Sequence, residues 1–146
     1  MRIREMVPAD VEEAAELLSA CFTDPWTRHS LEEIFRAGDY AALAAEEDSL
    51  AGLIIMKTVL DEADITTVAV SPSLRKQGIG KRLVGEMLRF ARERGIRTIF
   101  LEVRESNRAA RTLYEHAGFL QIGRRERYYR HPEEDAVLMR WDCPVR

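Results

Sequence analysis

The stretch Arg75-Lys76-Gln77-Gly78-Ile79-Gly80-Lys81-Arg82 is the most informative part of this chain. A strand-like run at residues 65–70 precedes it, and a helical pattern follows at residues 81–94. Gly78 and Gly80 allow the backbone to approach a ligand closely and to turn its N–H groups toward it. Basic residues near a helix N-terminus oppose the helix dipole by about 0.3–1 kcal/mol each, unless an anion is bound there. The octet therefore predicts an anion site, and phosphate is the anion that a helix start favours.

Two better-known phosphate loops do not fit the octet. A P-loop requires Gly-Lys-Ser or Gly-Lys-Thr, whereas Gly80 is followed by Lys81 and Arg82. A Rossmann fingerprint would place a glycine at Leu83 and would need an acidic ribose partner in a βαβ unit. The remaining alternative to a phosphate site is a solvated basic turn with two flexible glycines.

Composition predicts one globular domain over residues 1–146. Apolar residues make up 46% of the chain, charged residues make up 32%, and the net charge of −3 argues against a surface that coats nucleic acid. No apolar run approaches the roughly 20 residues of a membrane span, and residues 1–5 lack a signal-peptide core. Cys21 and Cys143 have no paired spacing, and the 3 histidines lack metal-ligand spacing. We expect a cytoplasmic protein without a metal, a membrane segment or a nucleic-acid partner, acting as a monomer or a weak dimer.

Hydrophobic periodicity predicts strands that alternate with helices. Apolar runs predict strands at residues 1–6, 40–46, 50–60, 63–70, 97–103, 119–129 and 136–141. Helical spacing predicts helices that begin near Pro8, Ser30, Lys81 and Asn107. Ser30 with Glu33 is typical of a capping box. The continuous apolar run at residues 53–56 predicts a strand that is covered on both faces.

The resulting order, β-α-α-β-β-β-α-β-α-β-β, resembles the fold of the GCN5-related N-acetyltransferases (GNAT superfamily) over almost the whole chain. Within that superfamily the chain resembles the RimI-like enzymes, which acetylate the N-terminal amine of ribosomal proteins. The stretches that carry the resemblance are Asp24-Pro25-Trp26, Val68-Ala69-Val70, residues 75–81, Leu101-Glu102-Val103-Arg104, Asn107, Leu113-Tyr114-Glu115, Gly118-Phe119, Tyr128-Tyr129 and Glu134-Asp135-Ala136. The resemblance implies an α/β (α+β) fold, with a mixed, mostly antiparallel sheet and helices on both faces.

The resemblance also implies that acetyl-CoA is the co-substrate and that the octet holds its pyrophosphate. The implied coenzyme contacts are Val68, Ala69, Val70, Arg75, Lys76, Gln77, Gly78, Ile79, Gly80, Lys81 and Asn107. The pantetheine arm would pair with residues 68–70 like an extra strand, which requires an open edge or a splayed gap in the sheet. Asn107 is also a helix cap by its pattern, and the two roles are compatible. Lys76 and Lys81 replace arginines that are common in RimI-like enzymes, but lysine still binds phosphate as a point charge.

Acetyl transfer needs a neutral amine, a fixed donor for the developing oxyanion and a proton for the departing thiolate. Glu102 follows the apolar run 99–101 at the end of a predicted strand, where partial burial would strengthen it as a base. The alternative is a surface ion pair with Arg104 or Arg75. Tyr114 lies on the apolar face of its helix, so a core tyrosine is the alternative to an acid. The resemblance implies that Glu102 is the base and that Tyr114 protonates the coenzyme sulfur.

Three aromatic residues are candidates for the acceptor side. Trp26 lies in a segment that breaks a helical pattern, and it is either a core anchor or a wall of the acceptor cleft. Tyr128 and Tyr129 lie in the last predicted hairpin, where tyrosine is also an ordinary strand residue.

The predicted function is direct acetyl transfer from acetyl-CoA to the N-terminal α-amine of a protein, as in the RimI-like enzymes with a small-subunit ribosomal protein. Neither cysteine lies in a motif with a base, so the sequence gives no sign of an acetyl-cysteine intermediate. The alternatives are acetylation of a small-molecule amine or of lysine, and a non-catalytic module that binds coenzyme A.

Overall fold

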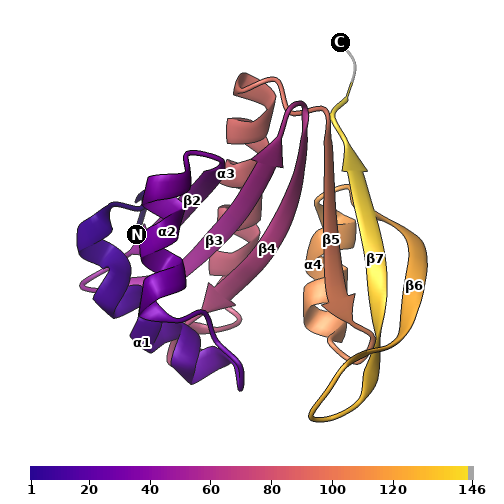
Figure 1. The fold of residues 1–146 in the computed structure, drawn as a ribbon, viewed down its shortest axis with the longest axis horizontal. Coiled ribbons are helices and arrows are strands. Elements are labelled where there is room, and N and C mark those ends of the chain that lie inside the picture. Colours follow the sequence, from indigo (N-terminus) through magenta and orange to yellow (C-terminus); the bar gives the residue numbers. More distant parts are fainter. Residues whose placement is uncertain (145–146) are drawn as a thin grey trace.

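The computed structural model describes residues 1–144. Its element order is the predicted one, with short 3-10 turns added (Figure 1). The strands are β1 (Arg2–Glu5), β2 (Tyr40–Glu46), β3 (Leu50–Val59), β4 (Glu62–Val70), β5 (Thr98–Arg104), β6 (Leu120–Tyr129) and β7 (Glu134–Asp142). The helices are α1 (Val11–Cys21), α2 (Arg28–Ala37), α3 (Ile79–Glu93) and α4 (Arg108–His116), and the turns are η1 (Pro8–Asp10) and η2 (Pro72–Leu74). Within residues 1–144, none of the helices is long and apolar enough to cross a membrane.

The described residues form one seven-stranded sheet with the order β1-β2-β3-β4-β5-β7-β6. Neighbouring strands run antiparallel except β4 and β5, which are parallel. Helices α1 and α2 lie on one face of the sheet, whereas α3 and α4 lie on the other (Figure 1). The predicted mixed, mostly antiparallel sheet with helices on both faces is confirmed.

The centre of the sheet is buried on both faces. Every residue of β3 from Leu50 to Met56 is buried. Ile54 and Met56 pack into the core under α3, whereas Leu53 and Ile55 pack into a second core under α1 and α2. Burial on both faces explains why this strand has a continuous apolar run, and it confirms the prediction made for residues 53–56.

Strands β4 and β5 pair over a short stretch and then part. Their ladder joins residues 62–64 to residues 98–100 and ends there. The β3–β4 register shifts at Ile55 and leaves Thr66 as an extra residue in β4. Such a bulge bends its strand and increases its twist, and Thr66 Oγ1 anchors it by donating to the Ile55 carbonyl oxygen at 3.2 Å. In Figure 1 the two strands lie together at one end and diverge toward the other.

The bulge also reverses which side chains of β4 face each core. Before it, Ala63 and Ile65 belong to the core under α3. After it, Val68 and Val70 pack against that same core, and Ala69 joins the core under α1 and α2. A regular strand would have kept odd-numbered residues on one face. The end of β4 is therefore held from both faces while it has no strand neighbour on the β5 side.

Two helix starts differ from the sequence prediction. Thr27, and not Ser30, is the N-cap of α2, because the Ser30 N–H donates to Thr27 Oγ1 at 3.0 Å. The predicted capping box is wrong, and Glu33 pairs instead with Arg36, with 2.6 Å between Oε1 and Nη1. Helix α3 begins at Ile79, two residues before the predicted start, because Gly78 already adopts the left-handed cap conformation.

Candidate active site

The loop before α3 presents backbone N–H groups that no side chain caps. Lys76 and Gly78 have positive φ angles of 65° and 82°. Left-handed residues in a turn point successive N–H groups to one side, which creates a concave anion site. Gly78 is the N-cap of α3 and receives no side-chain capping bond. The first N–H groups of a helix lack intrahelical partners, so this end of α3 is suited to phosphate.

Basic side chains surround the same helix start. Arg75, Lys76, Lys81 and Arg82 are all exposed, and the first turn of α3 contains no acidic residue. Arg75 Nε donates to the Val70 carbonyl oxygen at 3.2 Å, which fastens the loop to the end of β4. The structure thus brings the predicted basic residues together beside residues 68–70.

Gly80 lies where α3, α4 and β4 meet. A Cβ atom at this position would lie 3.4 Å from Leu113 Cδ2 and 3.8 Å from Val70 Cγ2. The close approach keeps the helix start near the strand. Asn107 Oδ1 accepts from the Ala110 N–H at 3.1 Å and so caps α4, as predicted. A contact of Asn107 with the coenzyme stays a prediction.

Two amide groups of β4 face the opening between β4 and β5. The Ser71 N–H donates to the Ala51 carbonyl oxygen at 2.8 Å, on the β3 side. Because the direction of the N–H groups alternates along a strand, Ala69 also faces β3, whereas Val68 and Val70 face away from it. The β4–β5 ladder has already ended at Asp64. The amides of Val68 and Val70 therefore form the open edge that was expected at residues 68–70.

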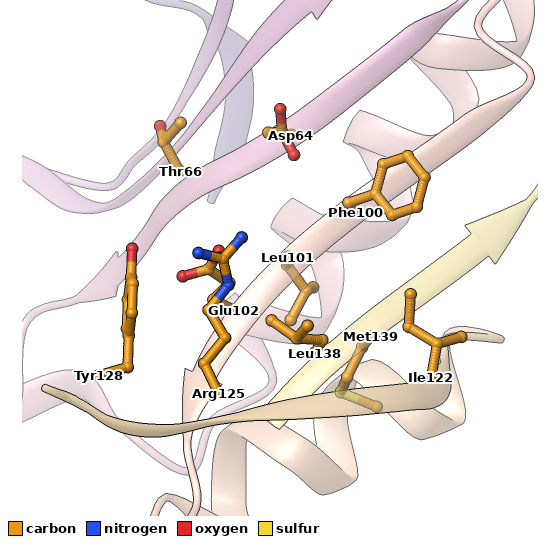
Figure 2. Close-up of a pocket in the computed structure, with 10 residues that line it drawn as sticks. All are labelled: Asp64, Thr66, Phe100, Leu101, Glu102, Ile122, Arg125, Tyr128, Leu138 and Met139. Carbon is orange, nitrogen blue, oxygen red and sulfur yellow. The ribbon is translucent and has the colours of Figure 1, made fainter. Parts of the chain in front are cut away.

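A pocket of about 620 Å³ lies on the opposite face of the sheet from α3 and α4 (Figure 2). Strands β4, β5, β6 and β7 supply its walls. The lining residues are Asp64, Thr66, Phe100, Leu101, Glu102, Ile122, Arg125, Tyr128, Leu138 and Met139. Partial burial and then the charge of Glu102 raise the pKa of Asp64. The pocket therefore combines an apolar floor with two neighbouring carboxylates.

Glu102 reaches this pocket from β5. The residue as a whole is exposed, but its side chain keeps only 31% of its accessible surface, which agrees with the expected partial burial. Glu102 Oε1 lies 3.7 Å from Arg125 Nε. The two alternative partners that were expected are wrong, because Arg104 pairs with Glu134 and Arg75 bonds to a backbone carbonyl. The physical reason is the side-chain alternation of β5, which turns Leu101 and Val103 into the core and Glu102 away from it.

Tyr128 and Tyr129 close the end of the pocket beside Glu102. Their ring centroids are 5.1 Å apart and the rings are nearly perpendicular. Hydrogen bonding to the Glu102 carboxylate and then burial raise the pKa of Tyr128. Burial and then the charge of Glu102 raise the pKa of Tyr129 to about 12. Tyr128 lines the pocket, whereas Tyr129 is half-buried behind it.

Tyr114 projects from α4 into the core and is 7% exposed. Its ring packs edge-on against Phe119, with centroids 5.7 Å apart. Burial and then the neighbouring Tyr129 raise the pKa of the Tyr114 phenol far above its ordinary value. A role of Tyr114 as an acid stays a prediction.

Residues 11–119 match the model of the acetyltransferase (GNAT) family. The chain belongs to this family. It is 35% identical over 140 residues to the ribosomal protein bS18-alanine N-acetyltransferase of Haemophilus ducreyi, covering 94% of this chain and 97% of that protein. It is 34% identical over 140 residues to the protein of the same name from Haemophilus influenzae, covering 94% and 95%.

Among solved structures, the fold is similar to the ribosomal-protein-S18-alanine N-acetyltransferase from Escherichia coli. The TM-score is 0.92 at 29% identity, and the match covers 99% of this chain and 95% of that one. The chain is therefore an N-acetyltransferase of the GNAT family, whose members take the acetyl group from acetyl-CoA.

Trp26 does not line the pocket of this acetyltransferase. It is half-buried and packs against the core under α1 and α2. Its ring meets Tyr40 edge-on, with centroids 6.1 Å apart. These contacts agree with the core-anchor alternative, and a contact of Trp26 with the acceptor stays a prediction.

Asp64 and Arg125 are pocket residues that the sequence analysis did not single out. The sequence contains a pattern that could have indicated Asp64, because Ala63-Asp64-Ile65-Thr66 alternates between apolar and polar residues and so predicts a polar face on this strand. No such pattern indicates Arg125, because it lies within a run of charged residues that is typical of a solvated edge strand. Only the β6–β7 pairing shows that Arg125 and Glu102 are neighbours.

Replacing Gly78 tests the anion site with a matched pair of variants. Gly78 has open space around its Cβ position but a φ of 82°, so Gly78→Asp and Gly78→Asn share the same backbone strain. Only the aspartate adds a negative charge where a pyrophosphate would bind. We expect Gly78→Asp to weaken acetyl-CoA binding by on the order of 10- to 1000-fold, as for a like charge at close range. Gly78→Asn should stay within about threefold of the wild type. Titration calorimetry measures both, and equal losses in the two variants would contradict the charge argument.

Proposed function

We propose that this acetyltransferase modifies the N-terminal α-amine of a protein, with the small-subunit ribosomal protein bS18 and its N-terminal alanine as the acceptor, in the cytoplasm. The single observation that carries the proposal is the parting of β4 and β5. On one face it opens toward a basic, uncapped helix start, and on the other toward a pocket with two carboxylates. Two substrates can therefore meet at the opening from opposite faces. The names of the two Haemophilus proteins support this choice of acceptor.

The coenzyme side would be formed by the octet and the end of β4. Acetyl-CoA supplies the acetyl group as a thioester. The N–H groups after Gly78 and the side chains of Lys76 and Lys81 suit its pyrophosphate. The outward amides of Val68 and Val70 would pair with the pantetheine arm as a neighbouring strand does. One of these two N–H groups would polarise the thioester carbonyl, where negative charge develops during attack.

The acceptor side would be formed by the pocket. An α-amine has a pKa near 8 and reaches the pocket mostly as a cation, which Asp64 and Glu102 attract. Glu102 would accept one proton from the ammonium, directly or through a water molecule, and would pass it to solvent, which leaves a neutral amine able to attack. Once the N–C bond has formed, the nitrogen would lose its second proton by the same route as the C–S bond breaks. The open position of Glu102 suits this role, because the proton can leave to solvent afterwards.

Tyr114 would donate to the departing sulfur. Its raised pKa keeps the phenol protonated near neutral pH, where the proton would be needed. Desolvation also raises the pKa of a thiol, so burial shifts the donor and the departing thiolate in the same direction. Transfer would be direct, from the thioester to the amine, without a protein-bound intermediate.

The acceptor preference is tested with matched peptides. One peptide offers a free N-terminal alanine and no lysine, and the other is blocked at its N-terminus and offers only a lysine side chain. At pH 7 the α-amine is neutral roughly a few hundredfold more often than the lysine amine, and we expect acetylation of the free N-terminus to dominate. Mass spectrometry of the products measures this. Equal or faster modification of the lysine peptide would remove the N-terminal assignment and leave the family membership intact.

Two conservative variants test the proton-transfer roles. Glu102→Gln keeps the shape of the side chain but cannot accept a proton, so we expect the rate to fall by roughly 10²–10⁴-fold and to recover partly as pH rises. Tyr114→Phe removes only the hydroxyl, and we expect lower turnover with unchanged acetyl-CoA affinity. Single-turnover rates across pH, with melting curves alongside, measure both effects. If Tyr114→Phe lowers the melting temperature but leaves the turnover rate unchanged, Tyr114 has a purely structural role and is not the acid.

A further inference from the structure

Strand β6 carries an unusually large bulge beside Glu102. Arg125 pairs with Ala136 and Tyr129 pairs with Glu134. Residues 126–128 of β6 therefore stand opposite the single residue Asp135 of β7. Arg125 precedes the bulge and Tyr128 is its last residue, and both line the pocket together with Glu102. Arg125 Nε lies 3.7 Å from Glu102 Oε1, and the Arg125 guanidinium lies 5.4 Å from the centroid of the Tyr128 ring.

The side chain of Asp135 holds this bulge through a hydrogen bond from the backbone of Arg127. Asp135 Oδ1 accepts from the Arg127 N–H at 3.0 Å. Arg127 has a φ of 51°, in the left-handed region that a bulky residue rarely adopts. Such a conformation persists only where surrounding contacts enforce it. Asp135 Oδ2 also accepts from Arg124 Nη1, at 3.3 Å.

Neighbouring bonds fix Asp135 itself relative to the rest of the site. The Glu105 N–H donates to the Asp135 carbonyl oxygen at 3.1 Å. Glu134, the preceding residue, accepts from the Ser106 N–H at 2.6 Å and from Arg104 Nη1 at 3.2 Å. These bonds tie the start of β7 to the turn between β5 and α4. The bulge is thereby held in a defined position relative to β5, which carries Glu102.

We propose that Asp135 is a positioning residue for the acceptor side of the site: it fixes the bulge at residues 126–128 and thereby holds the Tyr128 phenol against Glu102. Asp135 does not itself line the pocket. Figure 2 shows Tyr128 and Arg125 extending from the same strand toward Glu102, which is the arrangement that a relaxed bulge would lose. The role in acceptor binding rests on the proposed function, whereas the role in placing Tyr128 does not.

The first test measures the titration of Tyr128, which reports on its placement and does not depend on catalytic turnover. Tyrosine residues labelled with ¹³C at Cζ are titrated by NMR, and Tyr128→Phe assigns the signal. In the wild type we expect Tyr128 to titrate above an ordinary tyrosine, because the Glu102 carboxylate opposes loss of its proton. In Asp135→Ala the signal should shift back toward the ordinary range. In Asp135→Asn, whose amide oxygen can still accept from the Arg127 N–H, it should stay near the wild-type value. An unchanged titration in Asp135→Ala would overturn the proposal.

The second test separates positioning from general stability. Asp135→Ala should raise KM for the N-terminal peptide by about 5- to 30-fold, which corresponds to about 1–2 kcal/mol of binding free energy, while KM for acetyl-CoA stays within twofold. In a Tyr128→Phe background the same substitution should add little, because the contact that it disturbs is already absent. Additive effects, or an equal rise in both KM values, would contradict the proposal.

Glu133→Gln is the matched control in the same hairpin. Glu133 pairs with the Arg127 side chain, with 3.3 Å between Oε1 and Nε, and both side chains are largely exposed. This variant removes a charge beside the bulge and leaves the backbone bond to Asp135 intact, so neither KM nor the Tyr128 titration should change.

If Asp135→Ala fails to fold, Asp135→Ser replaces it, because the shorter side chain cannot reach the Arg127 N–H. If the wild type does not acetylate the N-terminal peptide, the proposed function fails and the Tyr128 titration still decides the role of Asp135.

Discussion

The separation of β4 from β5 beyond Asp64 is the constraint on which the rest of the site depends. A sheet normally satisfies the N–H groups of a central strand from both sides. Here the bulge at Thr66 bends β4 away, and the cores on both faces hold it there. Leaving the amides of Val68 and Val70 without a strand partner costs stability, and a ligand that pairs like a neighbouring strand would offset that cost.

Charge is distributed across this opening in a way that suits two different substrates. The start of α3 combines helix-end N–H groups with four exposed basic residues, Arg75, Lys76, Lys81 and Arg82, and it favours a polyanion. The pocket on the other face carries Asp64 and Glu102, and the charge of Glu102 raises the pKa of Asp64. A cationic amine between them would relieve that repulsion. Burial raises the pKa of the Tyr114 and Tyr129 phenols, so both remain protonated at neutral pH.

Local signals in the sequence were sufficient for the fold and for the geometry of the loop before α3. The apolar run at residues 53–56 marks a strand that is covered on both faces, and the glycines of the octet permit the backbone angles of the loop. The pocket beside Glu102 was less predictable because it depends on pairing between distant strands. The exposure of Glu102 and its pairing with Arg125 follow from the β5–β7–β6 register, and the placement of Tyr128 follows from a bulge opposite Asp135. The start of α2 at Thr27 was missed because Ser30 offered an equally good cap by pattern.

Residue-resolved amide hydrogen exchange by NMR, with and without acetyl-CoA, tests this account most directly. The amides of Val68 and Val70 have no strand partner in the free protein, whereas those of Thr67 and Ala69 face β3. We expect acetyl-CoA to slow exchange strongly at Val68 and Val70, to slow it at the loop amides after Gly78, and to change it little at Thr67 and Ala69. Protection confined to the loop, with Val68 and Val70 exchanging as in the free protein, would show that the opening between β4 and β5 is not where the coenzyme binds.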